Sequence, residues 1–206
     1  MSISPRKKPT QARAQERVNR ILDAAEQLLA NDGYDKFSTN RVAQLAEVNI
    51  ASLYQYFPNK AALLFAINRK LLDEVLELLE NSEASWPQQA WTSLFDPLTS
   101  ELLTSRKHVN LVRALEQAAV VSPELQQMER EHEETVAQFY SRFLKYYGSS
   151  WSDSDRLNAG RMIYAMCSIG LYDAEHLEES DRQRILQLFE LNVRQFVVSI
   201  LKEPAP

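Results

Sequence analysis

Side chains able to contact a nucleic acid gather in residues 49–60, which read NIASLYQYFPNK. Asn49 can cap a helix over 50–57, and Pro58 ends that helix because proline has no N–H to donate and disfavours helical geometry in the residue before it. Leu53 and Phe57 lie four residues apart and can face a core. The hydroxyl and amide groups that then point outward are suited to phosphates or base edges, and they belong to Tyr54, Gln55 and Tyr56. Alternatively, the two tyrosines are partly buried packing residues.

A second short helix precedes this one. Ser38 or Thr39 can cap it, and it continues to about Ala46. A longer helix over 14–31 stands in front, with apolar residues recurring at helical spacing. Two short helices joined by a tight turn are typical of a helix-turn-helix, in which the second helix enters the major groove and its first residues meet the base edges. Lys60 begins the next helix, where its ammonium group and backbone N–H groups can jointly hold a phosphate.

The charge along the chain favours the same region for contact with a polyanion. Residues 1–70 contain 11 Lys and Arg against 6 Asp and Glu, a net charge of +5. Residues 71–206 contain 12 against 22, a net charge of −10. We therefore expect only the basic N-terminal part to meet nucleic acid, although the two parts could also differ by chance.

Composition sets the class of protein. The chain has 206 residues, 45% of them hydrophobic and 25% charged, which allows one large or two modest globular domains. Its 4 glycines are few for a hairpin-rich β protein. Cys167 is the only cysteine, so no disulfide can form within the chain and a reducing compartment fits. The N-terminal segment has no signal-peptide h-region and no apolar run is long enough to span a bilayer, which predicts a cytoplasmic protein.

The remaining segments also read as helices, so we predict an all-α fold. Apolar residues at helical spacing continue from Leu63 to Leu79, and a polar stretch over 80–87 marks a domain junction. Further helices are expected over 87–104, 106–121, 123–147, 153–176 and 181–201. Pro97 should kink or split the first of these. The predicted division is a flexible basic arm over 1–13, a helix-turn-helix DNA-binding domain over 14–80 with its motif at about 38–57, and a ligand-binding and dimerisation domain over 81–206.

Residues 37–67, FSTNRVAQLAEVNIASLYQYFPNKAALLFAI, resemble the DNA-binding domain of the TetR-type (tetracycline-repressor-like) transcriptional regulators. The features that carry the resemblance are the Thr39 start, the LYQYF run over 53–57, and Lys60 followed by Leu63; with the preceding helix and Gly33 it covers about 14–67. The resemblance implies a two-domain all-helical homodimer that represses transcription and is released from a palindromic operator by a small molecule. It carries DNA contacts onto Thr39, Asn49, Ile50, Ala51, Ser52, Tyr54, Gln55, Tyr56 and Lys60.

Two positions depart from the family's pattern. Glu47 stands where the family commonly has glycine, and it brings a negative charge near the turn that either alters phosphate contacts or only faces solvent. Asn49 stands where serine or threonine is common, and asparagine caps a helix equally well. The basic arm, with Arg6, Lys7 and Lys8, either adds phosphate or minor-groove contacts or is a solubilising tail.

The C-terminal segment predicts a ligand cavity and a subunit interface. Large apolar residues can line a cavity, or can be plain core: Trp91, Phe95, Leu111, Leu115, Phe139, Phe143, Met162 and Met166. Few buried charges are indicated, so a neutral or hydrophobic effector is favoured. As the resemblance implies, the last two helices would form a four-helix interface between subunits through Ile163, Ile169, Ile185, Phe189, Phe196 and Ile200.

Two other classes of protein compete with a regulator. An enzyme would use the carboxylate-x-x-His spacing of di-iron bundles at Glu129 and His132 or at Asp173 and His176. Both segments are strongly polar, as solvated surface is, and nucleophile-elbow, Walker and dinucleotide motifs are absent from the sequence. A helical interaction adaptor that does not bind DNA is the third class. We predict a regulator that is not an enzyme and needs no cofactor or metal.

Overall fold

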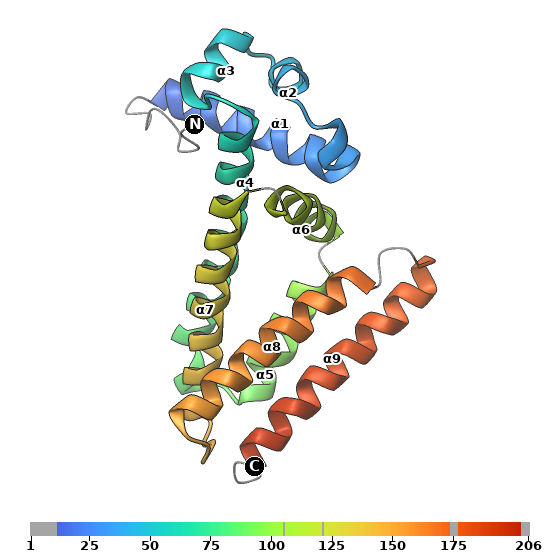
Figure 1. Ribbon diagram of the computed structural model, residues 1–206. Helices are drawn as coiled ribbons and strands as arrows, with labels where there is room; N and C mark the ends of the chain where they lie inside the picture. Colours follow the sequence, from blue (N-terminus) through green and yellow to red (C-terminus); the bar gives the residue numbers. More distant parts are fainter. Residues whose placement is uncertain (1–11, 105, 121, 174–176, 203–206) are drawn as a thin grey trace. The chain divides into compact units, whose positions relative to one another are not determined.

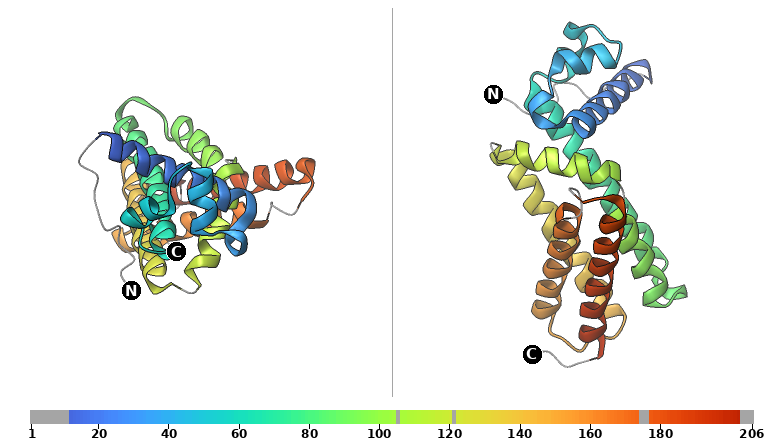
Figure 2. Two further views of the ribbon diagram at one scale, coloured as in Figure 1. Left: turned by 90° about the horizontal axis from the view of Figure 1, so that it is seen from above. Right: turned by 90° about the vertical axis from the view of Figure 1, so that its right-hand side faces the viewer.

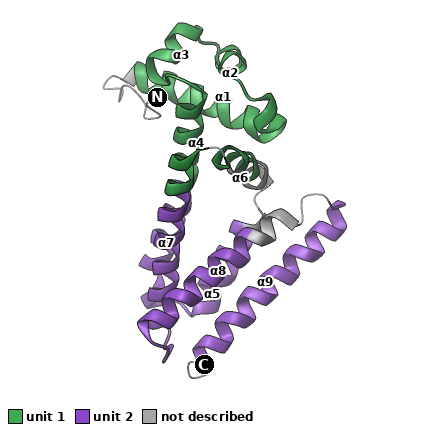
Figure 3. Ribbon diagram, viewed as in Figure 1, with its two compact units in different colours: residues 1–73, 106–128 green, residues 74–105, 129–206 purple. Residues whose placement is uncertain are grey.

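The computed structural model describes residues 12–104, 106–120, 122–173 and 177–202, and this part of the chain contains helices and no strand. The predicted all-α fold is therefore confirmed. The helices follow in the order α1 (Ala12–Lys36), α2 (Thr39–Leu45), α3 (Ile50–Tyr56), α4 (Lys60–Ala84), the 3-10 turn η1 (Trp86–Gln88), α5 (Trp91–Thr104), α6 (Arg106–Ala119), α7 (Pro123–Tyr146), α8 (Asp153–Asp173) and α9 (Glu179–Lys202) (Figure 1). They form two compact units: unit 1 contains residues 1–73 and 106–128, and unit 2 contains residues 74–105 and 129–206 (Figure 3).

Unit 1 is built on α1, which packs against α2 and α6. Ile21, Ala25 and Leu29 recur at four-residue intervals along α1 and are fully buried. They share a core with Leu53 of α3 and Leu63 of α4. The four-residue spacing puts these side chains on one face of α1, and this face contributes to the core that α1 shares with α3 and α4.

Helix α6 belongs to unit 1, which differs from the predicted division after residue 80. Leu111, Leu115 and Ala118 form a buried stripe along α6, and they lie in the same core as α1. An amphipathic helix must bury its apolar stripe against another element, and α1 is the element that receives it. A boundary drawn from sequence order alone misses this exchange because residues 106–128 return to the first unit after residues 74–105 have entered the second.

The helices of unit 2 pack around a core rich in aromatic side chains. Helix α5 packs against α8 and α9, and α8 and α9 run side by side (Figure 2). The approach of α8 to α7 is close at Gly160, because a Cβ atom there would lie 2.3 Å from the carbonyl oxygen of Ala137. Only glycine permits this backbone contact without displacement of one helix.

Glycine and proline positions in the helices follow local backbone rules. Gly148 has φ 95° and closes α7 in a Schellman motif, in which the Ser149 N–H donates to Leu144 O. Gly33 has a non-helical conformation with φ 75°, and α1 consists of two helical segments that meet there at a kink. Pro97 lies inside α5, so it does not split that helix.

Within the described residues, no helix is both long enough and apolar enough to cross a bilayer.

Candidate nucleic-acid interface

Side-chain caps fix both starts of the helix-turn-helix. The Arg41 N–H donates to Ser38 Oγ (3.4 Å) at the start of α2, and the Ala51 N–H donates to Asn49 Oδ1 (2.8 Å) at the start of α3. The predicted cap at Asn49 is confirmed, and Ser38, not Thr39, caps α2. These caps provide hydrogen-bond acceptors for backbone N–H groups that have no partner within the helix. They therefore stabilise the starts of α2 and α3.

The turn between α2 and α3 explains the unusual Glu47. Its φ is 54°, in the left-handed region. The Val48 N–H donates to Ala43 O (3.0 Å) and the Glu47 N–H donates to Gln44 O (3.2 Å), which is the Schellman arrangement. Glycine adopts this conformation without a Cβ penalty, which is the physical reason for glycine at such a position. Glu47 adopts it with strain, and its side chain is exposed.

We expect Glu47→Gly to stabilise the protein by roughly 0.5–1 kcal/mol, because it removes the strain of a left-handed non-glycine residue. It should also raise DNA affinity, since a carboxylate is removed near the proposed contact surface. Thermal unfolding and a DNA mobility-shift titration measure the two effects. Glu47→Ala is the matched control: it removes the charge but keeps the Cβ, so it should raise affinity without raising the melting temperature. A lower melting temperature for the glycine variant would contradict the strain argument.

Helix α3 turns one side to the core and the other outward. Leu53 and Phe57 are buried, as predicted, and Tyr54 and Gln55 are exposed. Tyr56 is also buried, so the prediction that it points outward is wrong. Positions 53, 56 and 57 are spaced i, i+3 and i+4, which is one continuous helix face, and unit 1 covers all of it.

Two predicted contact residues are linked to each other. Thr39 Oγ1 and Tyr54 Oη lie 3.0 Å apart and share a hydrogen bond that joins the start of α2 to α3. One hydroxyl donates to the other, so the second keeps a hydrogen that can be donated elsewhere. The pair is exposed, and a phosphate oxygen is a suitable acceptor for that hydrogen.

Lys60 is held more firmly than the sequence indicates. Its Nζ donates to Tyr34 O (3.0 Å) and lies 3.9 Å from the centroid of the Tyr34 ring. Burial lowers the pKa of Lys60 below its ordinary value, and the nearby Asp35 carboxylate opposes this shift. The Tyr34 carbonyl engages one of three ammonium donors. A phosphate contact through the others stays a proposal.

Arg41 is a residue of this region that the sequence reasoning missed. Its guanidinium donates to Asp32 Oδ2 (2.6 Å) and to Lys36 O (3.1 Å), so it ties the end of α1 to α2. A basic residue in the first turn of α2 was visible in the sequence, but its acidic partner is nine residues away. Because that carboxylate opposes its charge, we assign Arg41 a positioning role.

The predicted ligand-lining residues divide between the cores of the two units. Leu111 and Leu115 lie in the core of unit 1, whereas Phe95, Phe139 and Phe143 lie in the core of unit 2. Met162 is 53% exposed, so its predicted place in a cavity is wrong. Trp91 and Met166 are half-buried at the edge of the unit 2 core, as are three predicted interface residues: Ile185, Phe189 and Phe196.

Two further predicted interface residues are buried inside unit 2. Ile163 and Ile200 are fully buried in its core, so they cannot contact a second subunit in this conformation. The side chain of Ile169 lies outside the described residues. The exposed apolar side chains of α9 are instead Leu188 and Leu191, three residues apart on one helix face. Packing of α9 on α5 and α8 decided which apolar side chains of these helices stayed outside.

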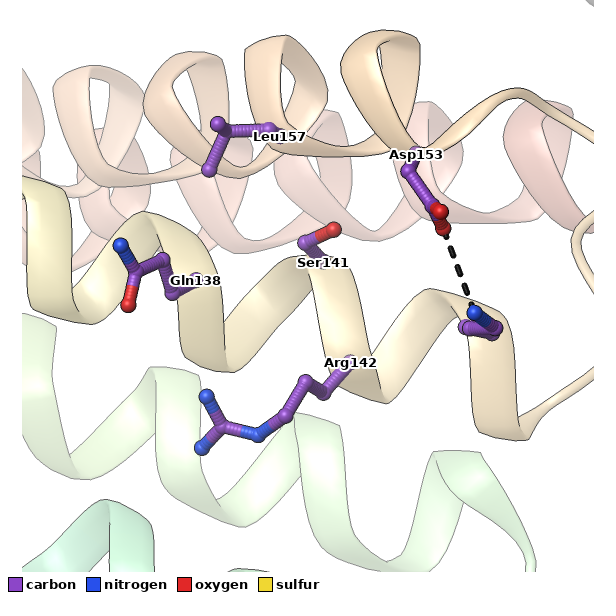
Figure 4. A pocket seen from close by; sticks show the side chains of 6 residues that line it. Gln138, Ser141, Arg142, Asp153 and Leu157 are labelled. Carbon is purple, nitrogen blue, oxygen red and sulfur yellow. Dashed lines mark hydrogen bonds and ion pairs between the residues drawn. The ribbon is translucent and has the colours of Figure 1, made fainter.

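A surface pocket of about 360 Å³ lies between α7 and α8 in unit 2 (Figure 4). The pocket is lined by Gln138, Ser141, Arg142, Lys145, Asp153 and Leu157. None of these residues was predicted to bind a ligand. Both cations have acidic partners, because Lys145 Nζ lies 3.3 Å from Asp153 and Arg142 forms a two-pronged ion pair with Glu83 at 3.0 and 2.7 Å. The pocket therefore has little unopposed charge with which to attract an ion.

The described residues also bear on the competing classes of protein. No group of three or more His, Cys, Asp and Glu side chains gathers there in a way that could hold a metal ion. The structure does not describe the side chain of Asp173, His176, or residues 1–11 of the arm predicted over 1–13. It does describe a capped α2, a Schellman turn and a half-exposed α3 packed on the core of unit 1, and these features define a helix-turn-helix protein.

Comparison with known proteins places this domain in a family. Residues 21–67 match the family described as bacterial regulatory proteins, tetR family. The HTH-type transcriptional repressor KstR of Rhodococcus jostii (strain RHA1) is 30% identical over 98 residues, which are 43% of this chain and 46% of that protein. The nucleoid occlusion factor SlmA of Haemophilus influenzae (strain PittGG) is 30% identical over 132 residues, 62% of this chain and 56% of that protein. The chain thus spans about half the length of the curated relatives it matches.

The fold is similar to that of solved transcription regulators. A TetR transcription regulator from Haloarcula marismortui superposes with a TM-score of 0.77 over 91% of this chain and 100% of that chain, at 15% identity. The match to the family falls on α1 to α4, where the helix-turn-helix lies. The resemblance of residues 21–67 to the TetR-type regulators is confirmed.

Proposed function

We propose that the protein is a transcriptional repressor that binds a palindromic operator as a homodimer and is released from it by a small molecule. The observation that carries the proposal is the match of residues 21–67 to the tetR family on a helix-turn-helix with an exposed recognition helix. The names of KstR and of other relatives, which are repressors, support the direction of control. The proposed location is the cytoplasm, where operator DNA is accessible.

The proposed DNA contacts come from one exposed surface of unit 1. They are the first turn of α3, with Asn49, Ile50, Ala51 and Ser52, together with Gln55, the Thr39–Tyr54 hydroxyl pair and Lys60. The side chains of the first turn are small or medium, so the backbone of α3 can approach base edges closely. Tyr56 is left out because it is buried. The hydroxyl pair and Lys60 are assigned to phosphates, which fix the register of α3 in the groove.

Footprinting on the DNA that flanks the protein's own coding region tests the proposal. We expect protection of a palindrome whose two half-sites are about one helical turn apart or slightly more, roughly 34–36 Å, because two-fold related recognition helices meet successive major grooves. Affinity should fall steeply with salt, since phosphate contacts release counterions. An absence of any protected site, with the protein folded and dimeric, would overturn the proposed function.

A further inference from the structure

Lys60, the first residue of α4, is held at both ends of its side chain. The Ala62 N–H donates to Asn59 Oδ1 (2.8 Å), and this cap fixes the backbone on either side of Lys60. At the other end of the side chain, Lys60 Nζ donates to Tyr34 O (3.0 Å). The stem of a lysine is flexible, and its ammonium group is usually surrounded by water. A lysine that is fixed at both ends therefore needs an explanation.

The acceptor of this hydrogen bond is a carbonyl group near the C-terminal end of α1, which ends at Lys36. The last carbonyl groups of a helix have no N–H partner in a following turn. Tyr34 O accepts from the Phe37 N–H (3.3 Å) and from Lys60 Nζ, so both of its lone pairs are used. The end of α1 thus provides a fixed anchor for the ammonium group of Lys60.

Two aromatic rings adjoin the same ammonium group. Lys60 Nζ lies 3.9 Å from the centroid of the Tyr34 ring and 5.6 Å from that of the Phe37 ring. Both distances are within the range of about 6 Å over which a ring face attracts a cation. Phe37 is buried, and Tyr34 is half-buried against the core of unit 1, so the rings are fixed in place. Tyr34 and Phe37 together form what we call the Lys60 cage.

The Lys60 ammonium group has already lost part of its hydration in the free protein. Burial lowers the pKa of Lys60 below its ordinary value, and the nearby Asp35 carboxylate opposes this shift. The residue is nevertheless only half-buried. Tyr34 O engages one of the three ammonium donors, and the other two have no partner among the described residues. They can therefore bond to an oxygen atom that approaches from solvent.

We propose that Tyr34 is a positioning residue for DNA binding, whose carbonyl group and ring hold the Lys60 ammonium where a DNA phosphate accepts its remaining hydrogens. The inference rests on the proposed function, in which Lys60 contacts a phosphate. A mobile lysine loses side-chain freedom and water when it binds a phosphate, and both losses weaken binding. In the Lys60 cage these losses occur largely on folding, so the same phosphate contact contributes more to DNA affinity.

Tyr34→Leu tests the role of the ring, because leucine keeps the carbonyl group and an apolar contact with the core. We expect about a fivefold loss of operator affinity for each subunit, hence about 25-fold for the dimer, which is the size expected when one long side chain becomes ordered only on binding. The salt dependence of affinity should stay the same, since Lys60 still reaches the phosphate. Tyr34→Phe keeps the ring, so it is the matched control and should bind the operator as the unmodified protein does.

A double variant with Lys60→Ala separates positioning from a structural role. Lys60→Ala by itself should weaken operator binding and lower the slope of log affinity against log salt by about 2, one phosphate for each subunit. In this background Tyr34→Leu should cause no further loss, because the ring has no ammonium group left to position. If Tyr34→Leu weakened binding equally in both backgrounds, Tyr34 would act on the fold alone and the inference would be overturned.

Nuclear magnetic resonance provides a measurement that needs no substitution. In the unmodified protein, the ring current of Tyr34 should displace the Lys60 Hε signals to low frequency, and this displacement should persist in the DNA complex. Hε signals typical of an exposed lysine, in either state, would overturn the inference. Unchanged operator affinity of a folded Tyr34→Leu variant would overturn this inference alone. If no operator is protected but Tyr34→Leu still weakens binding to a duplex of unrelated sequence, the inference stands and the proposed function is overturned.

Discussion

Ala51→Glu is expected to abolish specific DNA binding, with at least about a 100-fold loss of affinity, while the protein stays folded. Ala51 is exposed in the first turn of α3, which is the part of a recognition helix that meets base edges. A carboxylate there would face phosphates and base acceptors, and like-charge juxtaposition at an interface costs several kcal/mol. The same carboxylate lies at a helix N-terminus, where the helix dipole favours negative charge. DNA affinity should therefore fall while the free energy of unfolding stays the same or rises.

The measurement is a mobility-shift titration of the operator combined with thermal unfolding. Gln117→Glu is the matched control, because it adds the same charge at an exposed position of α6 in the same unit. That variant should bind the operator nearly as well as the unmodified protein. If Ala51→Glu bound the operator with unchanged affinity, the first turn of α3 would not face the DNA, and the orientation proposed for this helix would be wrong.

The double variant Leu188→Glu with Leu191→Glu is expected to be monomeric. These leucines are 55% and 51% exposed on one face of α9, and exposed large apolar side chains at adjacent positions are typical of an interface. In a two-fold symmetric dimer each glutamate would meet its own copies or apolar surface, and both are unfavourable. Operator affinity should also fall at least about 100-fold. A dimer binds two half-sites at once, and a monomer loses the additional affinity that this linkage provides.

Light scattering on the purified double variant measures its mass, and circular dichroism verifies its helix content. Val120→Glu is the control, since Val120 is a strongly exposed apolar residue just after α6 and its replacement should leave the dimer intact. A double variant that keeps the dimer mass would remove this face of α9 from the interface. Retained DNA binding by a proven monomer would contradict the requirement for two recognition helices.

The sequence by itself determined the features that depend on a few neighbouring residues. The cap at Asn49, the end of α3 before Pro58 and the start of α7 at Pro123 follow from local backbone chemistry, and the structure has all three. The outward orientation of Tyr54 and Gln55 followed from the burial of Leu53 and Phe57. Such signals are reliable because the atoms that satisfy one another lie within about one helical turn.

Only the tertiary structure decided which apolar faces were covered, and by what. Tyr56 lies beside the core stripe of a helix so short that its sequence allows either orientation, and unit 1 buries it. Helix α6 is amphipathic whichever element it packs against, and its packing on α1 places Leu111 and Leu115 in the core of unit 1. Along α9, Ile200 and Leu188 are both large and apolar, yet one is buried and the other exposed. The hydrophobic effect is non-directional, so a sequence shows that a face must be buried without showing which partner buries it.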